Sequence, residues 1–253
     1  MTADAVTRLA DLLAATAREG RTLDGLPPDL VPADDAAAYR VQAAVLERRG
    51  ERPAGRKIGF GPDGRVTGAW MAAGGLAASG AGWTTTAPSI GVELEIAVRM
   101  ARDLAPRPDR PYTAEEVMAA ADVVLVAIEI VVRRFAEPSK MPYTAVLADS
   151  ISHGGFVPGA SIPASRFREV TVAGAFAADG RSILKGPLVH PNGDWLAPLI
   201  AHASAPPAGL GPLRAGEYVT TGSLCGLLSV DVPCRLTGSV EGLGEVVIGF
   251  VGG

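Results

Sequence analysis

Two stretches of the chain alternate as β-strands do, yet they place carboxylates where a strand usually buries apolar side chains. The first spans residues 91–98 and reads Gly-Val-Glu-Leu-Glu-Ile-Ala-Val. Because successive side chains of a strand point to opposite faces, Glu93 and Glu95 lie on one face, roughly 7 Å apart, and the apolar residues lie on the other. Taken alone, this pattern suits a metal site or an exposed strand face equally.

The second stretch, residues 123–132, surrounds one carboxylate, Glu129, with nine apolar residues. An ionised carboxylate that is buried without a partner is strongly destabilising, so Glu129 must be paired, protonated or bound to a metal. Arg133 and Arg134, directly downstream, are candidate partners. Three carboxylates on two strands are also the oxygen ligands that Mg²⁺ and Mn²⁺ prefer. We therefore predict a divalent-metal enzyme.

The bulk properties narrow the class of protein. With 253 residues and 48% hydrophobic content, the chain is long enough for one large core. The net charge of -4 and the lack of a Lys/Arg run predict that nucleic acid is not a partner. The longest apolar run, 123–128, is far below the ~20 residues of a membrane span, and the start does not resemble a signal peptide. Two cysteines, Cys225 and Cys234, are interpreted as small buried hydrophobes of a cytoplasmic protein.

The pattern along the chain predicts an α+β fold in two parts. Residues 1–54 are alanine-rich with helical periodicity and form a small helical N-terminal lobe. Residues 55–253 consist mainly of short strands and glycine-rich turns and form the catalytic domain. Within it, Thr113 begins a capping box and therefore a short helix, and Asp179-Gly180 predicts a tight hairpin.

An ordered series of short motifs resembles one enzyme family. The motifs are Tyr-Arg-Val-Gln (39–42), Gly-Arg-Lys-Ile-Gly (55–59), Val-Glu-Leu-Glu-Ile (92–96), Ala-Ile-Glu-Ile (127–130), Leu-Ala-Asp-Ser (147–150), Pro-Leu-Val-His-Pro (187–191), Trp-Leu-Ala (195–197) and a run that ends in Thr-Thr-Gly-Ser (213–223). The series, which covers about 39–250, resembles the 2-keto-4-pentenoate hydratase and 4-oxalocrotonate decarboxylase branch of the fumarylacetoacetate hydrolase superfamily. The resemblance implies a mixed β-roll or barrel of the fumarylacetoacetase C-terminal type. It also implies Mg²⁺ or Mn²⁺ held by Glu93, Glu95 and Glu129, and a lysine, Lys57, in the pocket.

The chain departs from the pattern of this branch at three places. Members usually follow the third metal ligand with Val-Asp-Ser-Arg, whereas residues 131–134 read Val-Val-Arg-Arg, so that Val132 replaces the aspartate. The usual Ala-Asp-Asn ends here in Ser150, and the segment after Gly59 is shorter than usual. These changes affect the substrate pocket and leave the implied metal ligands intact. They therefore leave the identity of the substrate open.

Four further residues are candidates for the chemistry. Lys57, with Asp149, is predicted to carry protons, and Ser223 and His153 are predicted to bind the substrate. Each has a simpler interpretation: a surface lysine, a turn aspartate, a β-turn serine and a solvated loop histidine. Arg56, beside Lys57, is predicted to lie on the surface.

The resemblance implies short 2-hydroxy-dienoate substrates of the kind met in aromatic catabolism. We predict a divalent-metal-dependent hydratase that adds water to a 2-hydroxypenta-2,4-dienoate-like acid and gives a 4-hydroxy-2-oxo acid. The alternatives are a 4-oxalocrotonate-type decarboxylase and an acylpyruvate-type C–C hydrolase, which would need a His–Glu pair to activate water. A non-catalytic metal-binding partner subunit is the alternative from another class. A homo-oligomer, and a complex with a related subunit, are further expectations.

Overall fold

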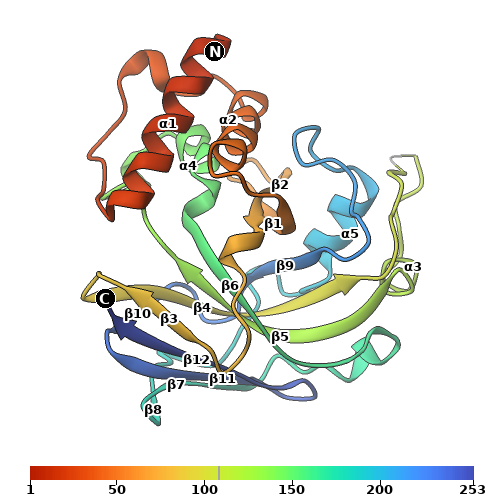
Figure 1. Ribbon diagram of the computed structural model, residues 1–253. Coiled ribbons are helices and arrows are strands. Elements are labelled where there is room, and N and C mark those ends of the chain that lie inside the picture. Colours follow the sequence, from red (N-terminus) through yellow and green to blue (C-terminus); the bar gives the residue numbers. More distant parts are fainter. Residues whose placement is uncertain (108) are drawn as a thin grey trace.

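Residues 1–107 and 109–253 are described by a computed structural model in which two β-sheets face each other and helices border the larger sheet (Figure 1). The helices are α1 (Ala3–Glu19), α2 (Asp35–Arg48), α3 (Ala114–Met118), α4 (Tyr143–Ala148) and α5 (Ala197–Ser204). The strands are β1 (Pro53–Phe60), β2 (Val66–Ala72), β3 (Gly82–Thr85), β4 (Ser89–Met100), β5 (Ala121–Val131), β6 (His153–Pro163), β7 (Gly174–Ala178), β8 (Arg181–Ser182), β9 (Tyr218–Ser223), β10 (Leu228–Asp231), β11 (Cys234–Val240) and β12 (Gly244–Gly252).

The larger sheet curls back on itself. Its order is β2-β1-β9-β4-β5-β6, with β10 also paired to β4. The segment after β2 meets the opposite edge, where Leu76 forms a bridge to Phe156 and Ala77 N–H donates to the Phe156 carbonyl at 3.0 Å. The described residues thus form an α+β fold with a rolled sheet, as predicted, but neither sheet closes into a barrel.

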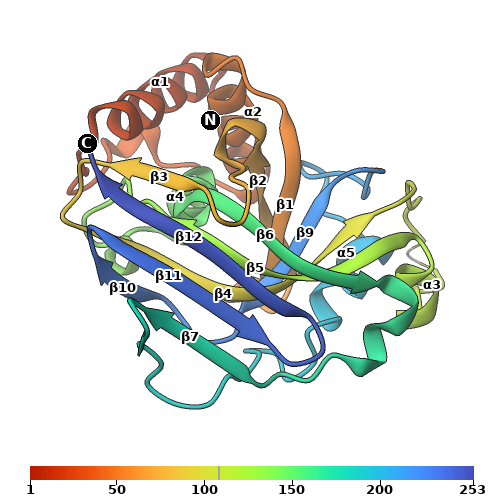
Figure 2. The ribbon, with the colours of Figure 1, turned by 60° about the horizontal axis from the view of Figure 1, so that its bottom comes forward.

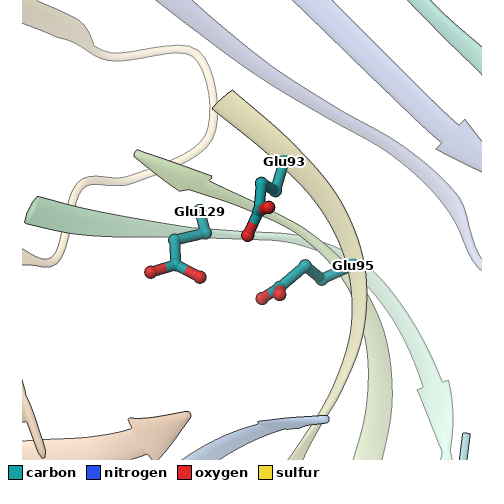
Figure 3. A group of neighbouring side chains, drawn as sticks. All are labelled: Glu93, Glu95 and Glu129. Atoms are coloured by element: carbon teal, nitrogen blue, oxygen red, sulfur yellow. The ribbon is translucent and has the colours of Figure 1, made fainter. Parts of the chain in front are cut away.

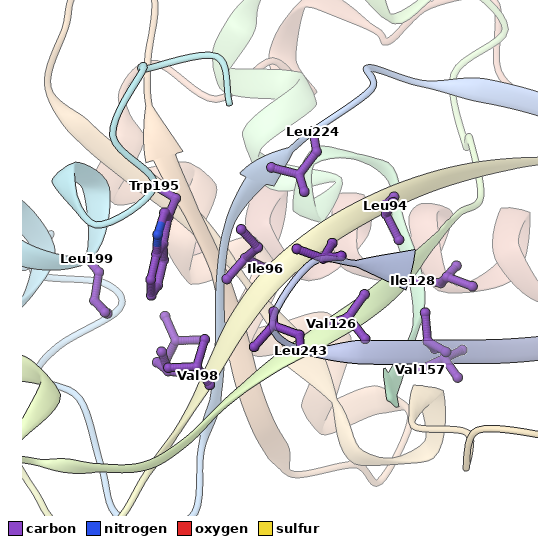
Figure 4. Packing of buried hydrophobic residues seen from close by; sticks show 14 of the residues in the cluster. Leu94, Ile96, Val98, Val126, Ile128, Val157, Trp195, Leu199, Leu224 and Leu243 are labelled. Carbon is purple, nitrogen blue, oxygen red and sulfur yellow. The ribbon is translucent and has the colours of Figure 1, made fainter. Parts of the chain in front are cut away.

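The smaller sheet covers one face of the larger one. Its order is β3-β12-β11-β7-β8, and Figure 2 shows β12 and β11 lying across β4 and β5, with β7 beyond β11. Leu94 and Ile96 of β4, with Val126 and Ile128 of β5, fill the space between the two sheets (Figure 4). Burying each such side chain contributes about 1.5–3 kcal/mol. This apolar packing sets which face of β4 and β5 is internal, so the alternate residues, Glu93 among them, must point into the curl.

The N-terminal helices pack on the outside of the roll. Thr2 and Asp34 cap the starts of α1 and α2, and Gly20 ends α1 with a positive φ of 63°. Their apolar faces share a second core with α4, to which Leu9, Val41 and Leu147 belong. The predicted helices are therefore present, while the division at residue 54 stays a prediction. No helix in the described part of the chain is long and apolar enough to cross a membrane.

Three local predictions can be compared with the structure. Thr113 and Glu116 form the predicted capping box of α3. Asp179 and Gly180, both with positive φ, make the turn between β7 and β8. The two cysteines are free and only partly buried at the edge of the main core, so the prediction of full burial was wrong.

Arg56 is completely buried, so the prediction of a surface arginine was wrong. Its guanidinium donates to both carboxylate oxygens of Glu217 at 2.6 Å and to the carbonyls of Leu210 and Gly211 at 2.9 Å. It also lies 4.5 Å from the centre of the Trp70 ring. These partners come from distant segments, and Arg56 thereby ties β1 to the segment that precedes β9.

We expect Arg56→Met to lower the free energy of unfolding by about 3–5 kcal/mol, because it removes the ion pair of the Glu217 carboxylate and the donor to the Leu210 carbonyl. Urea unfolding measures the effect. The matched control is Arg181→Met, on exposed strand β8, where a change within about 0.5 kcal/mol is expected. Equal effects in the two variants would contradict the role assigned to Arg56.

Candidate metal centre

Strands β4 and β5 bring three carboxylates together inside the curl. The register places Glu93 directly opposite Glu129, and Glu95 lies two residues further along β4 on the same face. One carboxylate oxygen from each residue lies within 4.8 Å of the others, and the three side chains point toward one another (Figure 3). Like charges directly opposite on neighbouring strands repel, so this arrangement needs compensating positive charge.

The three carboxyl groups differ in their protonation. Burial, and then the charge of Glu129, raises the pKa of Glu93 to about 7 and that of Glu95 well above its ordinary value. Burial also opposes ionisation of Glu129, but Lys57 and His153 outweigh it and lower the pKa of Glu129 to about 2. In the absence of a cation, Glu129 is therefore the most readily ionised of the three, whereas Glu93 and Glu95 hold their protons to higher pH than an ordinary glutamate does. A cation that binds all three oxygens must displace these protons.

Glu129 is paired with a lysine and a histidine, and neither predicted arginine partner contacts it. Its Oε1 accepts from Lys57 Nζ at 2.7 Å and from His153 Nδ1 at 2.9 Å. Burial lowers the pKa of His153, so the imidazole is neutral and donates its Nδ1 proton to the carboxylate. His153 begins β6 instead of lying on a loop, and it lines neither of the two cavities beside the carboxylates. In the structure its side chain contacts Glu129, and its role in substrate binding stays a prediction.

The carboxylates suit a divalent cation. Glu129 Oε2 is buried and has no hydrogen-bond partner among the described residues. Two oxygens bound to one Mg²⁺ or Mn²⁺ at about 2.1 Å are at most about 4.2 Å apart, so small side-chain movements bring all three oxygens into range. An all-oxygen donor set is the kind that Mg²⁺ and Mn²⁺ prefer. The residues present thus fit such an ion.

Lys57 lies at the junction of two cavities next to the carboxylates. One cavity, of about 290 Å³, is also lined by Glu93, Glu95 and Ser223, and the other, of about 390 Å³, by Glu93. Burial disfavours the charge on Lys57, but the three glutamates outweigh it and raise its pKa, so the side chain is an ammonium. Its Nζ also donates to the Ile151 carbonyl at 3.3 Å.

The predicted residue Ser223 lies in the wall of the smaller cavity, at the end of β9, with Thr221 and Gly222 beside it. Sequence reasoning missed Thr220, whose hydroxyl donates to Glu95 Oε2 at 2.5 Å. Its signal was available, because Thr220 stands in a strand two residues before the conspicuous glycine of the Thr-Thr-Gly motif. Its partner in a neighbouring strand could not be read from the sequence.

Asp149 has a different position from the one predicted. It lines neither cavity, and its Oδ1 accepts from Arg134 Nε at 2.5 Å instead of holding Lys57. Arg134 also donates to the carbonyls of Asp149 and His153, at 2.6 and 2.8 Å. Between those carbonyls, three consecutive residues, Ser150 to Ser152, have positive φ values of 51–58°. Arg134 and Asp149 therefore hold a left-handed turn that presents Ile151 to Lys57.

This turn is the second feature that sequence reasoning missed. A β-branched residue with positive φ is a strained outlier, and such strain persists only where the surroundings enforce it. Ile151 lines both cavities, and its carbonyl accepts from Lys57. No residue type in Ser-Ile-Ser signals this conformation, because glycine or asparagine is the usual choice there.

Comparison with known proteins identifies relatives over most of the chain. No protein-family model matches it. A 2-keto-4-pentenoate hydratase of Dechloromonas aromatica is 31% identical over an alignment of 265 positions, gaps included, which covers 94% of each chain. A 2-keto-4-pentenoate hydratase of Burkholderia vietnamiensis is 29% identical over an alignment of 266 positions, which covers 96% of each chain.

Solved structures share the fold. A 4-oxalocrotonate decarboxylase from Pseudomonas putida, complexed with magnesium and adipate, matches 99% of both chains with a TM-score of 0.80 and 19% identity. A fumarylpyruvate hydrolase from Pseudomonas aeruginosa, in complex with Mn²⁺ and pyruvate, covers 78% of this chain and 89% of its own with a TM-score of 0.56 and 16% identity. At these identities the likeness concerns the fold alone.

The rolled sheet with carboxylates inside its curl is thus the fold of the fumarylacetoacetate hydrolase superfamily. With 31% identity to a relative over 94% of its length, the chain belongs to the 2-keto-4-pentenoate hydratase and 4-oxalocrotonate decarboxylase branch of that superfamily. The resemblance seen in the sequence is confirmed. These relatives are named as hydratases and a decarboxylase, and this protein is likewise an enzyme.

Proposed function

We propose that this protein is a divalent-metal-dependent hydratase that converts a 2-hydroxypenta-2,4-dienoate-like acid into a 4-hydroxy-2-oxo acid. The observation that carries the proposal is the convergence of Glu93, Glu95 and Glu129 beside a cavity that also contains the Lys57 ammonium. The names of the curated relatives support the hydratase activity over most of the chain. In this proposal the three glutamates hold Mg²⁺ or Mn²⁺.

The residues around the cavity account for the chemistry as follows. Glu93, Glu95 and Glu129 would hold the divalent ion, which would supply Lewis acidity toward the 2-oxygen of the substrate. Ser223 Oγ, in the cavity wall, donates a hydrogen bond to the substrate carboxylate. Lys57 Nζ, oriented by Glu129 and the Ile151 carbonyl, delivers a proton to the far carbon of the diene.

The proposed reaction balances without any co-reactant other than water. The 2-hydroxyl loses its proton and C5 gains one, which gives the 2-oxo-3-enoate. Water then adds its hydroxyl to C4 and its remaining proton to C3. Lys57 gives a proton in the first half and recovers one from the 2-hydroxyl, so it ends as an ammonium. Asp149 has no part in this transfer, since its carboxylate is held by Arg134.

A 4-oxalocrotonate-type decarboxylase is the second candidate. The solved decarboxylase from Pseudomonas putida matches the whole fold, with a TM-score of 0.80, and Val132 stands where the branch usually has an aspartate. The acylpyruvate hydrolase has less support. His153 and Glu129 do form a His–Glu pair. However, His153 lines neither cavity, and Glu129 is one of the three glutamates that converge as the candidate metal ligands.

The test is turnover by the full-length protein after treatment with a chelator. We expect hydration of 2-hydroxypenta-2,4-dienoate to disappear and to return with Mg²⁺ or Mn²⁺. The product should carry ¹⁸O at C4 when the reaction is run in labelled water, as mass spectrometry can measure. Carbon dioxide release from 4-oxalocrotonate without hydration would favour the decarboxylase.

No metal-dependent turnover of either acid would contradict both enzyme assignments and favour the non-catalytic partner subunit. In that case the protein should still bind Mn²⁺. We further propose that the protein acts in the cytoplasm as a homo-oligomer. Size-exclusion chromatography with light scattering tests the oligomer directly, and it would also detect assembly with a related subunit.

A further inference from the structure

The proposed hydration needs a place for the attacking water, and the residues assigned so far do not supply one. In the smaller cavity the glutamates hold the ion, Lys57 transfers a proton and Ser223 binds the substrate carboxylate. A water that adds to C4 must be held about 3 Å from that carbon and turned toward it, because the rate depends on the orientation of the two reactants. A polar side chain beyond Lys57 in the same cavity is therefore required.

The smaller cavity extends along β1 from Lys57 toward the turn that joins β1 to β2. Gly59 lies two residues beyond Lys57 on the same face of the strand, roughly 7 Å away. A Cβ at Gly59 would meet no atom within 4 Å, so open space lies over this residue. Thr67, which pairs with Gly59 on β2, and Tyr143 line the same cavity. A Cβ at Gly61 would lie 3.5 Å from the Tyr143 hydroxyl oxygen, which places the phenol head at this end of the cavity.

Among the polar side chains at this end of the cavity, Tyr143 has the polar atom best placed to bind a water. The hydroxyl of Thr67 contacts that of the buried Tyr39 at 3.1 Å. The hydroxyl of Thr221 contacts a buried imidazole at 3.4 Å. Asn192 is exposed at the rim, whereas Tyr143 is half-buried. The Tyr143 hydroxyl is therefore the candidate for contact with a water inside the cavity.

The phenol of Tyr143 is suited to this contact. Burial raises the pKa of Tyr143, so its hydroxyl keeps the proton at neutral pH and can both donate and accept hydrogen bonds. Tyr143 begins α4, and the hydroxyl of the next residue, Thr144, donates to the Pro32 carbonyl at 2.7 Å, which anchors the start of the helix. The end of α4 leads into the left-handed turn whose carbonyl accepts from Lys57. One short helix thus positions both the phenol and the turn that orients the proton donor.

From this geometry we infer that Tyr143 holds the water that adds to C4 of the substrate. Its hydroxyl oxygen accepts a hydrogen bond from that water and leaves the water oxygen free to attack. The water gives its hydroxyl to C4 and its other proton to C3, and the phenol ends unchanged. This inference rests on the proposed hydratase function and deepens it, because proton transfer to C5 does not need this water whereas hydration does.

The experiment measures the two halves of the reaction separately in the full-length protein supplied with Mg²⁺. With 2-hydroxypenta-2,4-dienoate in D₂O, ¹H NMR follows deuterium uptake at C5, the unhydrated 2-oxo-3-enoate and the 4-hydroxy-2-oxo acid. The variant is Tyr143→Phe, which removes the hydroxyl alone. The matched control is Tyr112→Phe, because the Tyr112 hydroxyl donates to the Ala105 carbonyl at 2.8 Å and lines neither cavity. Titration of the Mn²⁺-loaded proteins with oxalate checks the metal centre.

We expect Tyr143→Phe to hydrate its substrate about 10²-fold more slowly than the unmodified protein, as a misplaced reactant does. Deuterium uptake at C5 should continue at an unchanged rate, so the unhydrated 2-oxo-3-enoate should accumulate. Tyr112→Phe should match the unmodified protein in both steps, and oxalate should bind all three proteins equally well. A purely structural role of Tyr143 would lower both steps together, so the ratio of the two rates identifies the water-holding role.

Three results for Tyr143→Phe would overturn the inference while leaving the proposed function intact. They are unchanged hydration, an equal loss of hydration and of deuterium uptake at C5, and a loss of oxalate binding. If the unmodified protein exchanged C5 without ever hydrating the substrate, or showed no metal-dependent reaction of either kind, the hydratase assignment would be wrong and the inference would fall with it.

Discussion

Lys57→Met should lower turnover by about 10²–10⁴-fold, the range typical of a lost general acid. The Lys57 ammonium lies 2.7 Å from Glu129 Oε1 and lines both cavities, where it can reach a bound substrate. Methionine keeps the length and removes the proton. Since the substitution also removes a positive charge beside the carboxylates, Mn²⁺ affinity should not fall, and oxalate should still bind.

The conservative variant separates a proton carrier from a simple counter-charge. If Lys57 carries the proton, Lys57→Arg should also be inactive, because a guanidinium does not give up its proton at neutral pH. Strong loss of oxalate binding in Lys57→Met, with recovery in Lys57→Arg, would contradict this role and assign Lys57 to charge balance. Normal turnover in Lys57→Met would exclude both roles.

Glu129→Gln should lower Mn²⁺ affinity tenfold or more, and turnover should decrease with it. The change removes the charge of one of three converging carboxylates, and the glutamine carbonyl remains as an acceptor for Lys57 and His153. Folding should survive, because Lys57 borders the cavities and keeps the carboxylates of Glu93 and Glu95 as neighbours that can balance its charge. Calorimetric titration with Mn²⁺ measures the affinity, and circular dichroism checks the fold.

The matched control is Glu245→Gln, an exposed glutamate on β12 outside the acidic cluster, which should bind Mn²⁺ as the unmodified protein does. Unchanged Mn²⁺ affinity in Glu129→Gln would mean that Glu129 serves only as the partner of Lys57 and His153. Loss of folding would mean that these two hydrogen bonds, and no metal, are the reason for its burial.

Several features followed from local chemistry and could be predicted. The period-2 pattern placed Glu93 and Glu95 on one strand face, since alternation is a property of the backbone itself. The helical lobe, the Thr113 capping box and the turn at Asp179 likewise depend on residues close together in the chain. The requirement that Glu129 have a partner also followed, because an unpaired buried charge is too costly.

Other features depended on which distant segments meet. The sequence suggested an arginine for Glu129, yet Lys57 and His153, 72 and 24 residues away, are its partners. Arg56 was expected at the surface because a charged residue usually is, yet an ion pair with Glu217, 161 residues further on, and carbonyls of distant segments stabilise it in the interior. Asp149 was expected near Lys57, but Arg134 holds it elsewhere.

Residue types and their spacing were enough to predict the class of chemistry. They showed three carboxylates on two strands, one of them in a setting that demands a counter-charge, in an order of motifs that belongs to one superfamily. The pairing of Lys57 and His153 with Glu129, and the set of polar residues that line the cavities, became visible only in the folded chain. The physical reason is that alternation and capping act between near neighbours, whereas pairing and cavity shape follow from the register of strands far apart in the chain.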